Sequence, residues 1–256
     1  MSCTVITALL LLLETVALSA QPRPAEIEVR GHSLTLHLYG KAGDPPIVLA
    51  SGDGGWVHLA PSVAEMLASH GCFVVGLDAK AYLESFTDGR STLSQEDVPG
   101  DFRVLIDFAA RSSPSAPAPL LVGVSEGAGL SVLAATSSEN RERLSGVIGL
   151  GLPDVNELGW RFRDSIIYIT KKVPNEPTFS VESVVEKVSP LPLAAIHSTH
   201  DEFVPLDVVR RLFERAGEPK KLWIIDASNH SFSGHEDELR QTLFEAIEWV
   251  RRNHRS

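Results

Sequence analysis

Cysteine is scarce in this chain, since only Cys3 and Cys72 occur among 256 residues. So few cysteines exclude a disulfide framework as the basis of the fold. Cys72 stands in an apolar run at 72–75, so we expect it to be a buried core thiol. Basic residues are also in the minority, with 23 Lys and Arg against 33 Asp and Glu and a net charge of −10. This acidic balance argues against a nucleic-acid-binding protein and against simple electrostatic attachment to anionic lipid.

Cofactor motifs are absent as well. No set of His, Cys and carboxylate residues has the spacing of metal ligands, and no Lys-Ser/Thr pair follows the glycine-rich stretch at 52–55 as a phosphate-binding loop requires. We therefore expect neither a metal nor another cofactor. Hydrophobic residues make up 43% of the chain, which supports a large core. A length of 256 residues suits one α/β domain.

The first twenty residues differ in character from the rest. An apolar run at 5–13 is followed by the small residues at 17–20, although no Lys or Arg precedes the run. The run is too short for a membrane span and is followed directly by Glu14. We expect residues 1–20 to be a cleaved export signal, with a retained anchor or an apolar N-terminal extension as the alternatives, and residues 21–256 to form a single domain.

Short apolar strands alternate with helical patterns through most of the chain. An alternating stretch at 26–39 predicts two antiparallel strands, and the wholly apolar run at 47–50 predicts a strand buried on both faces. Further strands are predicted at 73–78, 120–124, 146–150, 193–197 and 222–225. Helical patterns cover 59–69, 92–111, 128–136, 208–216 and 238–252. The segment 154–188 is irregular. The fold class is therefore α/β, a mostly parallel doubly wound sheet with helices on both faces and antiparallel N-terminal strands.

The sequence Gly-Val-Ser-Glu-Gly at 123–127 lies between a predicted strand and a predicted helix. This is the G-x-S-x-G pattern in the context that a nucleophile elbow requires, which makes Ser125 the candidate nucleophile. The pattern alone is common, and a plain turn of small residues is the alternative. An alcohol is a poor nucleophile at neutral pH, so Ser125 needs a base and a group that orients the base.

Candidates for both partners follow later strands. Asp201 follows the strand at 193–197 and His230 follows the strand at 222–225. Their order after Ser125 is that of the α/β-hydrolase fold, and residues past the carboxyl ends of such strands converge. We predict the triad Ser125, Asp201 and His230.

Other acidic residues and histidines lie near these positions. Glu202 is the alternative acid, whereas Asp226 comes too early to pair with His230. We expect His200 to lie near the cleft or to be structural, and His235 to lie on a solvated loop.

Acyl transfer also needs donors for the negative charge that develops on the carbonyl oxygen. The backbone N–H of Glu126, which follows the nucleophile, is one expected donor. The second should come from the loop after an earlier strand, where we favour the N–H of Asp53 over that of Gly54.

Three stretches carry a resemblance to a known family. The runs Ser-Gly-Asp-Gly-Gly-Trp at 51–56, Val-Val-Gly-Leu-Asp at 74–78 with Tyr82, and Leu-Val-Gly-Val-Ser-Glu-Gly-Ala at 121–128 resemble the bacterial virulence protein VirJ/AcvB family. The resemblance spans about residues 47–254. It implies an exported, periplasmic α/β-hydrolase-fold protein with the triad above, linked to type IV secretion or acting on aminoacylated phosphatidylglycerol. Gly54, Trp56 and Tyr82 are then expected to contact the substrate.

The chain departs from the family pattern near the nucleophile. Members usually have an aromatic residue where this chain has Glu126, and Asp where it has Gly129. A Glu126 carboxylate in the cleft would disfavour an anionic substrate and raise the pKa of the histidine, whereas on the helix surface it would do neither.

The irregular segment at 154–188 gives an acidic protein a local basic and aromatic character. Trp160, Arg161, Arg163, Lys171 and Lys172 lie in it. We expect Trp160 to help line the substrate pocket. The basic residues form either a solvated loop or a contact for an anionic headgroup.

Three functions are compatible with these residues. The first is a serine hydrolase that cleaves a carboxylic ester, with aminoacyl-phospholipids and other lipid esters among the candidates, through an acyl-enzyme. The second is an exported accessory or binding protein that works with secretion-system components without chemistry. The third is a thioesterase or peptidase with the same triad. The sequence predicts a small-molecule or lipid ester substrate, transient contact with a membrane surface and no nucleic-acid partner.

Overall fold

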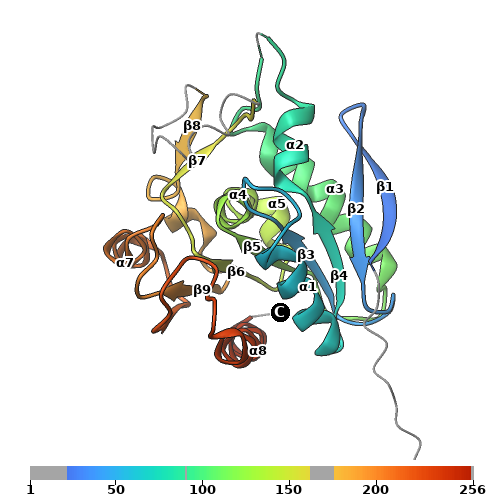
Figure 1. Ribbon diagram of the computed structural model, residues 1–256. Helices are drawn as coiled ribbons and strands as arrows, with labels where there is room; N and C mark the ends of the chain where they lie inside the picture. The colour runs from blue at the N-terminus through green and yellow to red at the C-terminus, as the bar shows by residue number, and fades with distance from the viewer. Residues whose placement is uncertain (1–21, 90, 162–175, 255–256) are drawn as a thin grey trace, which may run out of the picture.

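The computed structural model describes residues 22–89, 91–161 and 176–254. Within these ranges eight strands form one sheet in the order β1-β2-β4-β3-β5-β6-β9-β10 (Figure 1). The strands are β1 (Arg23–Val29), β2 (His32–Tyr39), β3 (Pro46–Ala50), β4 (Phe73–Leu77), β5 (Leu120–Val124), β6 (Gly146–Leu150), β9 (Leu193–Ser198) and β10 (Lys220–Ile225). A separate pair, β7 (Val155–Glu157) and β8 (Thr178–Ser180), forms a small antiparallel ribbon.

The direction of the strands follows the predicted pattern. β1 pairs with β2 and β2 with β4 in antiparallel fashion, and every other neighbouring pair of the large sheet is parallel. Every residue of β3, β4, β5, β6 and β9 is buried, because helices cover both faces of these strands. The predicted α/β fold is confirmed.

The sheet separates two buried clusters, and helices cover each of them. α1 (Leu59–Ser69) and α8 (Glu236–Asn253) pack on one face of the sheet with one buried cluster. α2 (Ala79–Ser85), α3 (Asp97–Ser112), α4 (Glu126–Ala135) and α7 (Leu206–Arg215) pack with the other cluster, and the short α5 (Ser138–Arg141) follows α4. Figure 1 shows α4 beside β5 at the centre of the molecule. Ser125, the predicted nucleophile, therefore lies between β5 and α4.

Some boundaries differ from those expected. α2 was not predicted because its seven residues are too few for a clear apolar period. α3 begins at Asp97 rather than at 92, and α4 begins directly after Ser125. The irregular segment at 154–188 contains β7, β8 and the 3-10 helix Val185–Val188.

Three other expectations concern single segments or sites. Cys72 is fully buried and burial raises the pKa of its thiol, which agrees with a core role. The expected export signal at 1–20 lies outside the described residues. Across the described ranges, no helix is long and apolar enough to cross a membrane, and no group of three or more His, Cys, Asp or Glu side chains is arranged for a metal ion.

Candidate active site

Ser125 occupies the turn between β5 and α4. Its φ of 51° and ψ of −120° are strained for a residue with a side chain, as a nucleophile elbow requires. The backbone N–H of Ser125 donates to the carbonyl of Leu150 at 2.8 Å, and its carbonyl accepts from the N–H of Ala128 at 2.8 Å. These bonds hold the strained turn against β6 on one side and the first turn of α4 on the other.

The glycines of the motif are required by space. A Cβ on Gly123 would lie 2.2 Å from the carbonyl oxygen of Gly127. A Cβ on Gly127 would lie 2.3 Å from the carbonyl oxygens of Ala50 and Ser51. α4 therefore packs directly on the backbone of β3 and β5, which brings its N-terminus close to the sheet.

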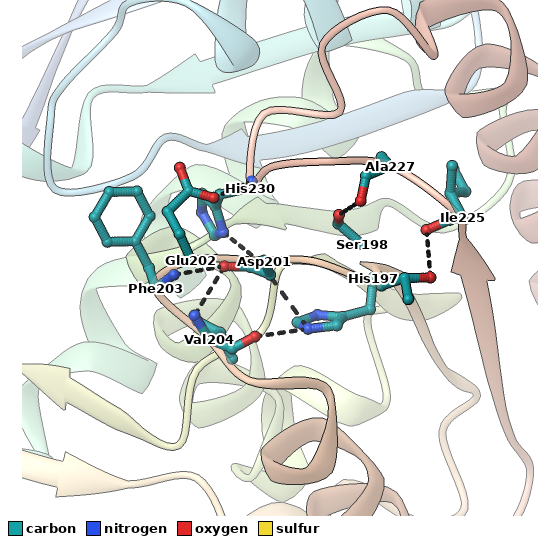
Figure 2. Close-up of polar contacts among 10 residues, drawn as sticks. His197, Ser198, Asp201, Glu202, Phe203, Val204, Ile225, Ala227 and His230 are labelled. Carbon is teal, nitrogen blue, oxygen red and sulfur yellow. Dashed lines mark hydrogen bonds and ion pairs between the residues drawn. The ribbon is translucent and has the colours of Figure 1, made fainter.

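Asp201 and His230 are brought together from two strand ends. Nδ1 of His230 lies 2.6 Å from Oδ2 of Asp201, and the other carboxylate oxygen accepts the N–H groups of Phe203 and Val204 at 2.9 and 2.8 Å (Figure 2). Burial alone would raise the pKa of Asp201. The hydrogen bond from His230, the charge of that ring and the two backbone N–H groups outweigh this effect and hold the pKa of Asp201 below its usual value.

The alternatives to this pair are placed elsewhere. Glu202 accepts the backbone N–H of His230 at 2.7 Å, so it holds the main chain of the base and not its ring. Asp226 lies 3.8 Å from His200, and both side chains are exposed. His235 stands at the start of α8, where its ring lies 3.2 Å from Glu238.

Gly151 lies between His230, the predicted base, and the backbone that holds Ser125. It has a φ of +60°, and a Cβ at this position would lie 2.4 Å from Cε1 of His230. The imidazole therefore rests on the backbone that follows β6. That strand is the direct neighbour of β5, and the carbonyl of Leu150 is bonded to the N–H of Ser125. The fold thus places Ser125 after β5 and the pair of Asp201 and His230 after β9 and β10, with Gly151, at the end of β6, between them.

The expected oxyanion donors lie on the other side of Ser125. Glu126 is the first residue of α4, so its N–H has no acceptor within the helix. A Cβ on Gly52 would lie 3.3 Å from Cβ of Ser125, and the turn at 52–55 is closed by a bond from the N–H of Gly55 to the carbonyl of Gly52 at 3.0 Å. Asp53 and the exposed Gly54 form the tip of this turn beside the nucleophile.

The Glu126 side chain is buried rather than on the helix surface. Its carboxyl accepts the backbone N–H of Glu157 at 2.7 Å, which joins the nucleophile elbow to β7. Burial, followed by the charges of Glu157 and Asp53, raises the pKa of Glu126 well above its usual value. The raised pKa disfavours the ionised form on which the expected effect on substrate charge depends.

Glu126→Gln is expected to stabilise the protein at neutral pH. Between the unfolded pKa of 4.5 and the raised folded pKa, the unfolded chain is ionised while the folded protein holds the proton, so wild-type stability falls as pH rises. Glutamine keeps an acceptor for the N–H of Glu157 and removes this penalty. Chemical denaturation between pH 4 and 8 should show the variant gaining on wild type above pH 4.5. The exposed Glu65→Gln serves as the control, and an equal gain there would contradict the explanation.

The neighbour of Gly129 explains why this position, where the family pattern has Asp, holds a glycine. A Cβ at this position would lie 1.9 Å from Oδ1 of Asn156, whose side chain is fully buried and donates to the carbonyl of Asp154 at 3.1 Å. The amide of Asn156 on β7 therefore fills the place next to α4 that a larger residue at 129 would take.

Gly129→Ala is expected to destabilise the protein, although alanine favours helices. The methyl group must displace the Asn156 amide, and such overpacking typically costs about 1–3 kcal/mol against a helix gain of about 1 kcal/mol. Thermal unfolding should show a lower Tm. Gly100→Ala in α3, where a Cβ meets nothing within 4 Å, should raise Tm, and Asn156→Ala should rescue the first variant. A Tm for Gly129→Ala above that of wild type would contradict this explanation.

Two residues expected to contact the substrate have structural partners. Tyr82 is 1% exposed and its hydroxyl donates to Asp101 at 2.7 Å, so a substrate contact by Tyr82 is not supported. The ring of Trp56 covers Gly76 and stacks on His37 with ring centres 4.5 Å apart. These contacts pack the loop at 51–56 against β2 and β4, so a substrate contact by Trp56 is not supported.

Trp160 lies beside a hollow on the surface. Nζ of Lys80 stands 4.2 Å from the centre of its ring, and both line a cavity of about 520 Å³ with Arg161. Arg161 is ion-paired with the buried Glu176 and donates to the carbonyl of Asp88 at 2.6 Å, so it has structural partners. Arg163, Lys171 and Lys172 lie outside the described residues. A larger hollow of about 690 Å³ between β10 and α8 includes none of the predicted site residues.

Sequence reasoning missed three features near the base. Phe203 is 59% exposed and packs edge-to-face on His230 with ring centres 5.6 Å apart. Glu202 was weighed only as an acid, and Gly151 was not singled out. An exposed aromatic directly after two acidic residues, and a glycine directly after a buried strand, were the available signals.

The chain has the α/β-hydrolase fold. At 17% identity it superposes on the esterase Pf2001 of Pyrococcus furiosus with a TM-score of 0.68, covering 90% of this chain and 92% of that one. The α/β hydrolase GrgF of Penicillium sp. sh18 gives a TM-score of 0.67 at 13% identity, covering 91% and 99%.

The family resemblance is confirmed over part of the chain. Residues 44–157 match the family described as "Bacterial virulence protein (VirJ)". A curated relative, the uncharacterized protein YfhR of Escherichia coli O157:H7, is 26% identical over 63% of this chain. The match spans 57% of that relative's length. The VirJ segment includes Ser125 and the loop at 51–56 but ends before Asp201 and His230.

Proposed function

We propose that this protein is a serine hydrolase that cleaves carboxylic esters through an acyl-enzyme. The observation that supports the proposal is the hydrogen-bonded pair of Asp201 and His230, whose imidazole contacts Gly151 at the end of β6, the strand beside the one that leads into the strained Ser125. An imidazole whose Nδ1–H is fixed by a carboxylate has Nε2 free to accept a proton, which is the state that a general base needs.

In the first half of the proposed reaction, Oγ of Ser125 attacks the ester carbonyl while Nε2 of His230 takes the hydroxyl proton. The N–H groups of Glu126 and Asp53 donate to the resulting oxyanion. When the tetrahedral intermediate collapses, the bond to the alcohol breaks and His230 returns the proton to the departing oxygen. The product is an ester between Ser125 and the acyl group.

In the second half, water takes the place of the alcohol. His230 accepts a proton from water as its oxygen attacks the acyl-enzyme, and then gives the proton back to Oγ of Ser125. Asp201 stays ionised throughout, in keeping with the lowered pKa of this carboxyl. Its role is to orient the ring and to stabilise the imidazolium.

A lipid ester is the substrate that the family resemblance suggests. The exposed Phe203 ring next to His230 offers an apolar contact at the mouth of the site, which suits an acyl chain better than a charged group. We therefore place aminoacylated and simple phospholipids beside soluble esters in the substrate panel.

Labelling with a fluorophosphonate and turnover of p-nitrophenyl acetate test the proposal. The expected result is covalent labelling at Ser125, located by peptide mass spectrometry, together with turnover. A folded protein that neither labels nor turns over would overturn it. If the protein hydrolyses thioesters or amides faster than esters, the ester assignment is replaced, while the assignment of the three catalytic residues stands.

A binding role without chemistry is the second candidate. One observation favours it, since the VirJ segment at 44–157 ends before the acid and the base. If binding is the function, a Ser125→Ala chain should restore a deletion phenotype as well as wild type does. Loss of restoration in that folded variant would exclude this candidate.

A further inference from the structure

A second histidine lies behind the acid, on β9. His197 is fully buried, and its Nε2 lies 2.9 Å from the carbonyl oxygen of Val204 and 4.0 Å from Oδ2 of Asp201 (Figure 2). That carboxylate oxygen also faces Nδ1 of His230. Asp201 is thus placed between two imidazole rings.

The chemistry of the contacts fixes the proton on His197. A carbonyl oxygen can only accept a hydrogen bond, so Nε2 of His197 carries the hydrogen and donates it to Val204. Nδ1 is buried and has no hydrogen-bond partner in the described residues. A proton there would lack an acceptor, so the ring is neutral. Burial outweighs the charge of Asp201 and lowers the pKa of His197, which also favours the neutral ring.

The bond to Val204 closes the turn that presents the acid. The N–H of Val204 and that of Phe203 hold Oδ1 of Asp201, while the carbonyl of Val204 is held by His197. Both the N–H and the carbonyl of Val204 are therefore held by hydrogen bonds. Oδ1 of Asp201 is occupied by backbone N–H groups, and Oδ2 faces His230. If the turn loosened, the carboxylate would move with it.

A packing role alone does not account for a histidine here. An apolar side chain of similar shape would fill the buried space without leaving a ring nitrogen unpartnered, and an unpartnered buried polar atom is unfavourable. His197 therefore has one unfavourable unpartnered nitrogen, Nδ1, and one hydrogen-bond donor, Nε2–H, that reaches the carbonyl of Val204. An apolar residue at this position would have no such donor.

We propose that His197 is a positioning residue of the active site, which holds the 201–204 turn through Nε2–H so that Asp201 orients His230. The inference rests on the proposed serine hydrolase. The groups that face the His197 ring are the Asp201 carboxylate and, beyond it, the His230 imidazole. His197 acts through Asp201 and does not touch the substrate.

The test compares His197→Gln with His197→Phe, using p-nitrophenyl acetate. Glutamine places an amide N–H near the position of Nε2, whereas phenylalanine fills the space without a donor. We expect His197→Phe to lower kcat by about 100-fold, the typical effect of misplacing a reacting group by about 1 Å, with KM nearly unchanged. The acidic limb of its pH–rate profile should move to lower pH because the imidazolium is less stabilised. His197→Gln should recover most of kcat and the wild-type profile.

A structural control separates positioning from stability. Asn140 is buried and donates to the carbonyls of Pro99 and Ala134 at 2.8 and 2.9 Å, so Asn140→Ala removes comparable bonds in another part of the chain. It should lower Tm without changing kcat or the pH profile. The low-field proton resonance of the bond between His230 and Asp201 should persist in this control and in His197→Gln, and weaken in His197→Phe.

The outcomes are distinct. A folded His197→Phe with wild-type kcat and pH profile overturns the inference, as does a folded His197→Gln that is as impaired as His197→Phe. If His197→Phe does not fold, His197→Asn, whose amide is too short to reach Val204, takes its place under the same criteria. Wild-type protein that neither labels nor turns over defeats the proposed hydrolase itself and is recognised before any variant is made.

Discussion

Ser125→Ala is expected to lower kcat/KM for a short soluble ester by about 10⁶-fold, the scale of removing the nucleophile from a serine triad. The physical reason is that the variant can form no acyl-enzyme, and only water activated in the same site remains. Fluorophosphonate labelling should vanish with turnover. Burst kinetics, in which p-nitrophenol is released before the steady state, should also be lost.

The control for this variant is a serine in the helix that follows Ser125. Oγ of Ser131 is buried in α4 and donates to the carbonyl of Gly127 at 2.7 Å. Ser131→Ala should lose about 1 kcal/mol of stability through that bond and keep both labelling and turnover. Ester turnover by Ser125→Ala at more than a hundredth of the wild-type rate would place the nucleophile elsewhere.

Asp201→Asn is expected to lower kcat by about 10⁴-fold, the loss known for this exchange in a serine triad. An amide N–H₂ facing Nδ1 of His230 donates where the carboxylate accepted, so the ring takes the tautomer whose Nε2 already carries a proton. Such a ring cannot serve as a base. Steady-state kinetics over pH 5 to 9 measure the effect, with part of the lost rate expected to return at high pH.

Glu202→Gln is the matched control for this second variant. Glutamine retains an oxygen that can accept the backbone N–H of His230, which is the contact that Glu202 makes. We expect less than about a tenfold loss, in line with the net value of a typical hydrogen bond. A larger loss in Glu202→Gln than in Asp201→Asn would exchange the roles of the two carboxylates.

The mostly parallel sheet and the strand ends that carry Ser125, Asp201 and His230 were predictable from sequence, whereas the order of the strands in the sheet was not. Runs of four to six apolar residues between turn signals predict buried parallel strands, and the residues that follow such strands converge. That reasoning placed Asp201 rather than Glu202 on the ring, because the first acidic residue beyond the strand is nearer to the sheet end. The geometry agrees with this choice.

The substrate contacts were less predictable, because a sequence pattern does not reveal the direction of a side chain. Tyr82 lies on α2, a helix that the pattern did not indicate, and the helix turns its ring into the core against Asp101. Trp56 follows a glycine-rich turn, and the stacking partner that directs its ring, His37, comes from β2. Both placements depend on contacts between segments far apart in the chain.

The bond between Glu126 and the backbone of Glu157 bears on attempts to redesign the specificity of this protein. It fastens the β7–β8 ribbon to the residue next to the nucleophile. Grafting a foreign ribbon in its place would require a matching acceptor at position 126, or the start of α4 would lose one of its anchors. Residue 126 and the graft should therefore be randomised together in a library, with selection first for folding and then for turnover.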